Sequence, residues 1–102
     1  MKHTLVSLTA AKAGQEAEFK QWYSDTHVKE VLAIPGISNA RVSKVGAAFG
    51  YMPWQQVAMF DLDFANPEDA LGEIQARIKN GKIGLHPSVE MTAVSLFTFE
   101  TP

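Results

Sequence analysis

The stretch Val57-Ala58-Met59-Phe60-Asp61-Leu62 carries apolar side chains at both odd and even positions. Because side chains alternate between the two faces of a β-strand, Val57 and Met59 occupy one face and Ala58 and Phe60 the other. A sheet with one face in water alternates apolar and polar residues instead. This stretch therefore predicts a strand in a sheet that is covered on both faces.

The rest of the chain divides into strand and helix patterns around that stretch. Strands are predicted over residues 4–9, 37–45, 55–64 and 91–99, and helical segments over residues 15–26 and 28–33. A further helix is expected with Asn66 as N-cap, Pro67 in its first position and Gly81 as its stop. The order β-α-β-β-α-β predicts one α+β, ferredoxin-like domain over residues 1–102, with a four-stranded antiparallel sheet.

Both helical regions of this fold cover the same face of the sheet, so the second face needs another cover. The last predicted strand places Phe97 and Phe99 on one face and Leu96 on the other. Leaving two Phe side chains in water forfeits on the order of 3–6 kcal/mol, which is a large share of a small domain's stability. We therefore expect a symmetric homodimer that forms through the sheet faces.

Composition excludes several classes of function. The 102 residues carry a formal net charge of -2 and no basic run, so we expect no nucleic-acid partner. The absence of cysteine excludes disulfides, thiolate metal sites and cysteine nucleophiles. No phosphate-binding loop and no G-x-S-x-G motif occurs, and no apolar run is long enough for a membrane span. The stretch from Met1 to Leu8 becomes polar too early for a signal peptide, so a cytoplasmic protein is expected.

The first helical segment is predicted to have an aromatic face. Phe19, Tyr23 and His27 follow at i+4 steps, with Trp22 beside them on the same side. An imidazole can pass a proton in either direction near neutral pH, and the Tyr23 hydroxyl can orient a carbonyl oxygen. Phe19 and Trp22 would supply the apolar walls of a ligand pocket. The alternative is an ordinary core in which His27 only closes the end of the helix.

Two further side chains are candidates for ligand binding. His86 lies in the loop before the last predicted strand, from which it could reach the pocket beside the first helix. Tyr51, near Trp54, could hold a substrate oxygen or cover the pocket mouth; the alternative, which we favour for this pair, is packing against the partner subunit.

Charged side chains near these residues have simpler interpretations. Arg41 is expected to form an ion pair with Asp61 or Glu100 across the sheet. Asp25 with His27, or His27 with Glu30, has a spacing that permits metal binding without being diagnostic of it. We therefore expect no metal site.

The segment from Phe19 to Ile37 resembles the dimeric α/β-barrel superfamily, particularly its EthD-like branch. In that branch an F-x-x-W-Y-x-x-x-H-x-x-E pattern precedes a P-G turn and a strand that often carries an Arg; here Pro35-Gly36 and Arg41 match. Lys29 stands where relatives often have a Pro. The resemblance implies a homodimer whose sheets pack into a barrel, with a pocket between sheet and helices in each subunit.

Known members of this superfamily include monooxygenases, isomerases, polyketide cyclases and haem degraders, so the resemblance leaves two classes of function open. The first is a cofactor-independent enzyme that acts on a small aromatic or polyketide-like carbonyl compound, with His27 as general acid/base. The second is a non-catalytic ligand-binding or accessory protein of a degradation pathway. A haem-degrading version would need His27 or His86 to reach the iron. We expect no cofactor.

Overall fold

The computed structural model describes residues 2–102, and Met1 lies outside the described part. The elements in chain order are β1 (Lys2–Thr9), α1 (Glu16–Trp22), a π-helical segment (Tyr23–His27), α2 (Val28–Leu32), β2 (Ile37–Lys44), β3 (Gln56–Leu62), α3 (Glu68–Lys79), a short 3-10 helix (Met91–Ala93) and β4 (Ser95–Thr101). The strands pair antiparallel in the order β2-β3-β1-β4. The predicted ferredoxin-like α+β fold with its four-stranded antiparallel sheet is confirmed.

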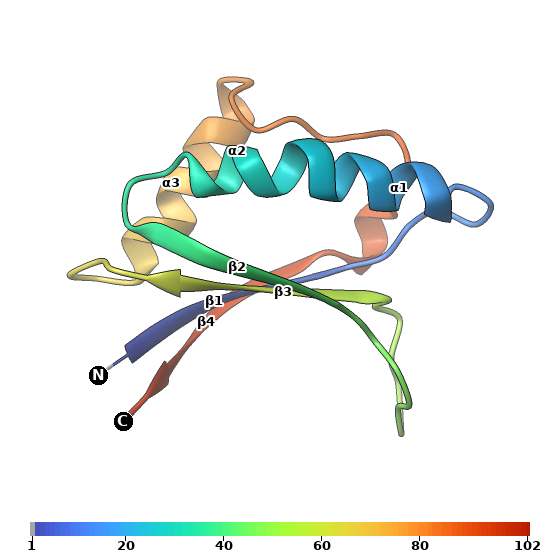
Figure 1. Cartoon of the computed structure of the whole chain (residues 1–102), viewed down its shortest axis with the longest axis horizontal. Coiled ribbons are helices and arrows are strands. Elements are labelled where there is room, and N and C mark those ends of the chain that lie inside the picture. Colours follow the sequence, from blue (N-terminus) through green and yellow to red (C-terminus); the bar gives the residue numbers. More distant parts are fainter. Residues whose placement is uncertain (1) are drawn as a thin grey trace.

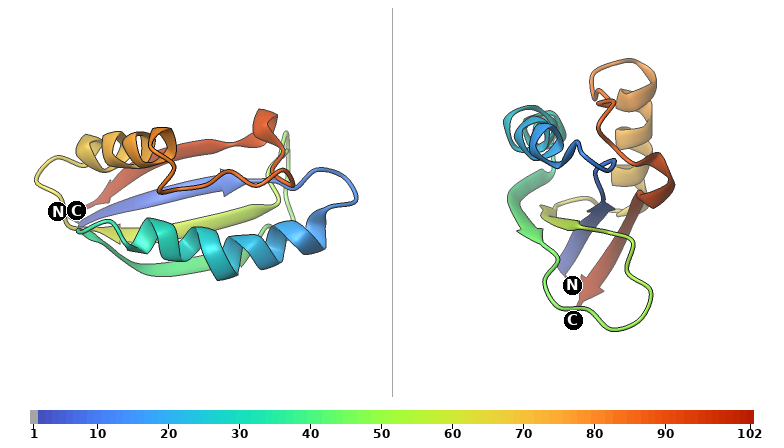
Figure 2. Two further views of the ribbon diagram at one scale, coloured as in Figure 1. Left: turned by 90° about the horizontal axis from the view of Figure 1, so that it is seen from above. Right: turned by 90° about the vertical axis from the view of Figure 1, so that its right-hand side faces the viewer.

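All helices lie on one face of the sheet, and the opposite face carries no helix (Figure 1). Seen from above, α1 and α2 run along one side of this layer and α3 lies on the other (Figure 2). The chain that connects α3 to β4 passes back between them. This connection pairs with the segment that follows β1 through an isolated bridge between Ala11 and Val89, so it forms part of the layer that covers the sheet.

The two faces of the sheet differ in burial as the alternation of residues predicts. On the face toward the helices, Leu5 pairs with Phe60, and both side chains are fully buried. On the opposite face Met59 is only half-buried, and Phe97 and Phe99 are 42% and 40% exposed. The sheet therefore has one face in the core and a second, apolar face that the described chain leaves open. We call this second face the open sheet face.

The first helical region contains a wide turn that the sequence did not predict. The Val28 N–H donates to the carbonyl of Tyr23, five residues earlier, which is the hydrogen bond of a π-helix. No side chain caps this point, although Ser24 and Asp25, both of residue types that often cap helices, lie beside it. A cap is not needed there, since the wide turn keeps the backbone hydrogen bonds within one continuous helix.

Two further differences from the prediction have a local cause. Met91–Ala93 is a 3-10 helix instead of the start of β4, because the Glu90 carboxylate accepts hydrogen bonds from both the backbone N–H and the hydroxyl of Thr92. Pro67 precedes α3 instead of occupying its first position, and Asn66 Oδ1 accepts from the Glu68 N–H at 3.1 Å. The predicted stop holds, since Gly81 follows the helix with φ of +84°.

The loop between β2 and β3 bends away from the helices, toward the side of the open sheet face (Figure 1). We call residues 46–54 the arm. Within the arm, Phe49 is fully exposed and Tyr51 is 86% exposed. The Tyr51 and Trp54 rings meet edge to face with centroids 6.4 Å apart. The arm thus carries aromatic side chains that its own chain does not cover.

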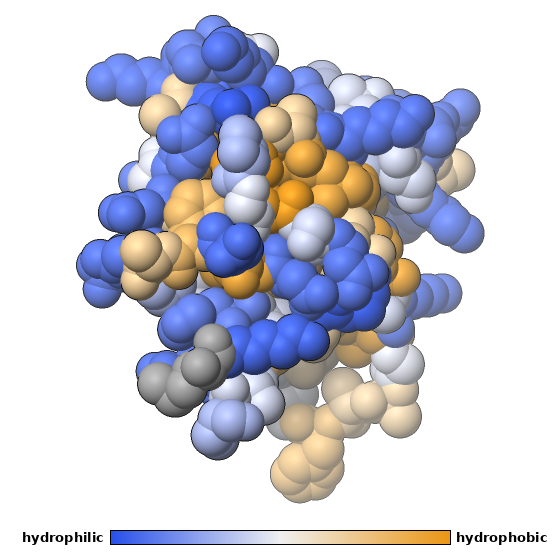
Figure 3. All heavy atoms as spheres, turned by 60° about the vertical axis from the view of Figure 1, so that its left-hand side comes forward, coloured by the Kyte–Doolittle hydropathy of each residue, from blue (hydrophilic) through white to orange (hydrophobic). Residues whose placement is uncertain are grey.

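Apolar side chains also reach the surface at the end of the molecule where the described termini lie. Figure 3 shows them gathered at the centre of this view, with polar side chains around them. No helix of residues 2–102 is both long enough and apolar enough to cross a membrane.

Candidate functional site

A cavity of about 90 Å³ lies between the sheet and the helical layer. The face of the sheet toward the helices forms its floor, with Leu5, Phe60 and Leu96 among the side chains there. One wall comes from α1, the π-helical segment and α2, and the other from α3 and residues 85–94. We call this space the central cavity. It is the pocket between sheet and helices that the resemblance to EthD-like proteins led us to expect.

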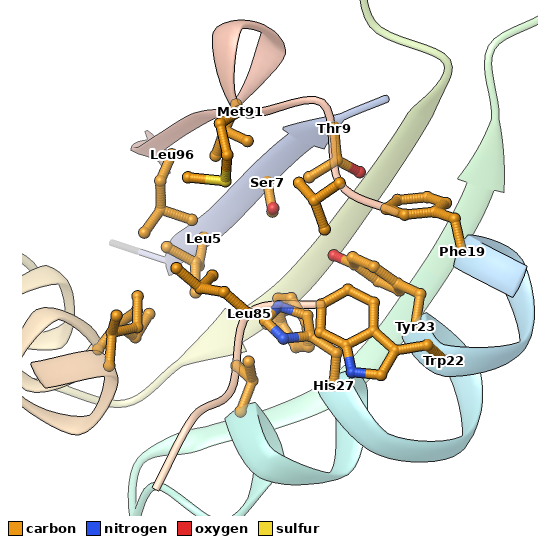
Figure 4. Close-up of a pocket in the computed structure, with 16 residues that line it drawn as sticks. Leu5, Ser7, Thr9, Phe19, Trp22, Tyr23, His27, Leu85, Met91 and Leu96 are labelled. Atoms are coloured by element: carbon orange, nitrogen blue, oxygen red, sulfur yellow. The ribbon is translucent and has the colours of Figure 1, made fainter. Parts of the chain in front are cut away.

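The predicted aromatic face lines the central cavity. Phe19, Trp22, Tyr23 and His27 all contribute to its wall (Figure 4). The ring centroids of Tyr23 and His27 are 4.8 Å apart, and those of Trp22 and His27 are 4.9 Å apart. The helical spacing therefore brings together the four residues that it predicts.

Three polar atoms in the cavity wall have no hydrogen-bond partner within the described part of the chain. They are the Tyr23 hydroxyl, His27 Nδ1 and Thr9 Oγ1, and all three are buried. Figure 4 shows the Tyr23 hydroxyl pointing toward β1, where Ser7 and Thr9 lie. A buried polar group without a partner costs about 1–3 kcal/mol, and most such groups in proteins are bonded. A ligand with oxygen atoms would satisfy them.

Burial sets the protonation states of the two titratable groups. It raises the pKa of Tyr23 above its ordinary value, although a weak interaction with the Ser7 hydroxyl, whose geometry falls short of a hydrogen bond, opposes the rise. It lowers the pKa of His27, although the negative charge of Glu30 opposes that change. At neutral pH the cavity wall therefore holds a neutral phenol that can donate a hydrogen bond and a neutral imidazole that can accept a proton.

His86 does not line the central cavity. Its ring stacks on Trp22 and contributes instead to a shallow hollow on the outer surface. His86 Nδ1 accepts a hydrogen bond from the Ser88 N–H at 3.2 Å and lies 2.7 Å from the fully buried Ser88 hydroxyl. Nδ1 is thus occupied as an acceptor, and the structure places His86 as an anchor of its loop.

Tyr51 also lies outside the cavity, since it belongs to the arm. Arg41 forms the expected ion pair with Asp61, at 3.1 Å. The Asn39 amide also donates to the Asp61 carboxylate at 3.0 Å. The hydrogen bond from the Asn39 amide has the larger effect and Arg41 the smaller one, and together they hold the pKa of Asp61 below its ordinary value. These charges lie at the open sheet face, away from the site.

No group of three or more His, Asp or Glu side chains within residues 2–102 could hold a metal ion. The central cavity encloses about 90 Å³, less than the ~150 Å³ of an apolar protein cavity that binds benzene, so a haem could not be enclosed by it.

Sequence reasoning missed Ser7 and Thr9 as lining residues. They follow Leu5 at steps of two, on the buried face of β1, and both are buried. Hydroxyl side chains on the apolar face of a predicted strand were the available signal. The residues at the mouth of the cavity gave no such signal: Leu85 lies in a loop, and Met91 falls in a predicted strand where the structure has a 3-10 helix.

No family model matches the sequence, and no curated protein matches it either. Several solved structures share its fold. An ethyl tert-butyl ether D (EthD) family protein from Bacillus halodurans C-125 superposes with a TM-score of 0.67 at 19% identity over 100% of both chains. A DABB family protein with a ferredoxin-like fold from Mesorhizobium loti MAFF303099 gives 0.63 at 13% identity over 99% of this chain and 97% of that one.

An EthD-like protein from Ralstonia eutropha JMP134 gives a TM-score of 0.54 at 22% identity, over 98% of this chain and 92% of the other. At such identities the likeness establishes a common fold. The fold expected from the resemblance to EthD-like proteins is therefore confirmed.

Proposed function

We propose that this protein binds a small aromatic or polyketide-like carbonyl compound in the central cavity, and that His27 acts on it as general acid/base. One observation carries this proposal. The Tyr23 hydroxyl and His27 Nδ1 are buried and without hydrogen-bond partners within the described residues, and their rings are adjacent in the wall of a largely apolar cavity. Buried titratable groups with shifted pKa values in a cavity are typical of functional sites.

The two side chains have complementary roles in an enolisation. The Tyr23 hydroxyl donates a hydrogen bond to the carbonyl oxygen of the ligand, and the neutral His27 imidazole removes a proton from the adjacent carbon. The electrons of that C–H bond form a C=C bond, and the carbonyl π electrons move to the oxygen, where the Tyr23 hydrogen bond stabilises the negative charge. The imidazolium then holds the proton close to the enolate.

Two outcomes follow from this intermediate without any change in oxidation state. In an isomerisation, the imidazolium returns the proton to a different carbon. In a cyclisation, the enolate carbon attacks a second carbonyl carbon of the same molecule, a C–C bond forms, and the imidazolium protonates the new alkoxide. Both reactions match the isomerase and cyclase types that the resemblance implies. A non-catalytic ligand-binding or accessory protein would use the same cavity without the proton transfer.

Exchange of hydrogen for deuterium next to a carbonyl distinguishes these functions. Aromatic ketones and linear 1,3-dicarbonyl compounds are incubated with the protein in D₂O, and exchange is followed by NMR together with binding. General acid/base catalysis contributes about 10²–10⁴-fold, so His27→Ala should slow exchange by that factor. His86→Ala is the matched control, because both imidazoles contact Trp22 and only His27 lines the cavity.

Saturable binding without exchange would favour the non-catalytic function. Full exchange activity in His27→Ala would show that His27 is not the base. If none of the compounds bound, the ligand class would be wrong.

The open sheet face supports a second part of the proposal, a homodimer formed through that face. Met59, Phe97 and Phe99 leave apolar surface in water there, and the arm extends on the same side of the sheet (Figure 1). A second copy of the chain would cover this surface, and Phe49 and Tyr51 of the arm would pack against it.

A further inference from the structure

We propose that the ligand of the central cavity is uncharged and elongated: its polar head group meets the Tyr23 hydroxyl, and its apolar tail leaves between α3 and residues 85–94. This inference rests on the proposed binding function and specifies the class of ligand that the cavity accepts.

The lining argues against a charged ligand. Sixteen of the described residues line the central cavity, and none of them is Asp, Glu, Lys or Arg. A carboxylate, phosphate or ammonium group would lose its water on entry and find no opposite charge, which costs several kcal/mol even after relaxation. The polar atoms present are hydroxyls and an imidazole, which suit a neutral oxygen atom.

The polar end of the cavity is defined by Tyr23. Its side chain is 1% exposed, and its hydroxyl is without a partner. Ser7 and Thr9 lie on the strand toward which this hydroxyl points (Figure 4). Met91 and Leu96 lie on the opposite side of the cavity from Phe19 and Trp22 in the same view. The head group therefore belongs beside Tyr23, and the apolar remainder extends toward Met91.

The mouth of the cavity indicates an elongated ligand. A volume of about 90 Å³ is smaller than the ~150 Å³ that encloses benzene, so even a single ring extends beyond the enclosed part. Four large apolar side chains at the mouth, Ile78, Leu85, Met91 and Val94, are each more than a third exposed. An apolar tail that leaves the cavity would cover these side chains, and water would leave both surfaces.

Four related compounds test the two parts of the inference at neutral pH. They are 4-butylacetophenone, 4-methylacetophenone, methyl 4-butylbenzoate and 4-butylbenzoate, and their dissociation constants are measured by calorimetry or by NMR titration. The butyl ketone and the methyl ester should bind with similar affinity. The ionised 4-butylbenzoate should bind at least about tenfold more weakly than its ester. The butyl ketone should bind about tenfold more tightly than the methyl ketone, as expected for partial burial of three methylene groups.

Two variants locate the tail and the head. Val94→Asp places a charge at the mouth and should remove most of the advantage of the butyl chain. Val42→Asp is the matched control, because Val42 is 41% exposed against 43% for Val94 but lies in a different groove. Tyr23→Phe should weaken both ketones by about fivefold through loss of one hydrogen bond, and leave the effect of chain length unchanged.

Equal affinity for 4-butylbenzoate and its methyl ester would overturn the uncharged head group. Equal affinity for the two ketones, or an equal effect of Val94→Asp and Val42→Asp, would overturn the path of the tail. If no neutral compound bound saturably while the protein stayed folded, the proposed binding function itself would fail. The result thus separates an error in the ligand class from an error in the function.

Discussion

The imidazole of His86 stacks on the indole of Trp22, with ring centroids 5.4 Å apart and ring planes at 28°. His27 contacts the same indole, with centroids 4.9 Å apart. Only His27 lines the central cavity, whereas His86 lies at the outer surface. Trp22 therefore separates two histidines with different environments: one in the wall of the cavity, and one that holds a loop in place.

Replacement of His86 should affect stability more than binding. His86→Ala leaves the fully buried Ser88 hydroxyl without its partner, which should lower the free energy of unfolding by about 1–3 kcal/mol. Ligand affinity should change by less than about threefold, because His86 lies outside the cavity. Urea denaturation and a ligand titration measure the two effects. A large loss of affinity at unchanged stability would instead assign His86 to the binding site.

Protonation of His27 should make stability depend on pH. Burial holds its pKa in the folded protein below the ordinary value of 6.5, so the unfolded chain binds this proton first as the pH falls. The free energy of unfolding should therefore decrease as the pH falls below 6.5 toward the folded-state pKa, and this contribution should level off below that pKa. His27→Gln should lose this part of the pH dependence. Identical pH profiles for the two proteins, from urea denaturation, would contradict the assignment.

Two glycines with positive φ differ in what surrounds them. A Cβ on Gly36, at φ of +94°, would lie 2.8 Å from both the Asp63 carbonyl oxygen and Phe64 Cε1. A Cβ on Gly14, at φ of +82°, would meet nothing within 4 Å. Gly14→Ala should therefore cost only the backbone strain of about 1–2 kcal/mol. Gly36→Ala should cost more than about 3 kcal/mol, because the backbone must also move. Equal losses of stability in urea denaturation would show that the turn before β2 is less tightly packed.

A charge on the open sheet face should separate the proposed homodimer. Sedimentation should show a dimer of the wild-type chain at micromolar concentration, and Phe97→Glu should raise the dissociation constant by at least about 100-fold. Val42→Glu is the control, because Val42 is 41% exposed against 42% for Phe97 and faces the helical side. A wild-type chain that sediments as a monomer would refute the homodimer.

Much of the fold could be predicted because successive side chains of a strand point to opposite faces of the sheet. This alternation needs no knowledge of the rest of the chain. The burial of Ala58 and Phe60, with Met59 on the opposite face, follows from that alternation. Met91–Ala93 was different, since its apolar and β-branched residues suit a strand. There the Glu90 side chain bonds the backbone of Thr92 and outcompetes the strand pairing, a local contact that residue propensities do not contain.

The site could be predicted only as far as helical spacing extends. Phe19, Tyr23 and His27 share the cavity wall because i+4 neighbours lie on one side of a helix. His86 and Tyr51 lie in loops. A loop has no regular period from which the direction of a side chain can be predicted. Whether a loop residue meets a helix residue depends on tertiary packing, as the stacking of His86 on Trp22 shows.

The π-helical segment brings the buried side chains before and after it onto the same side of the first helix. Each residue of an α-helix turns the chain by about 100°, so Phe19 and Val31 would lie about 120° apart around an unbroken α-helix. The extra residue in the wide turn reduces that difference to about 20°, and both side chains are buried in the core. A chain shortened by one residue between Tyr23 and His27 could form an unbroken α-helix with Phe19 and Val31 still about 20° apart, whereas a chain of the present length in a regular α-helix could keep only one of the two buried.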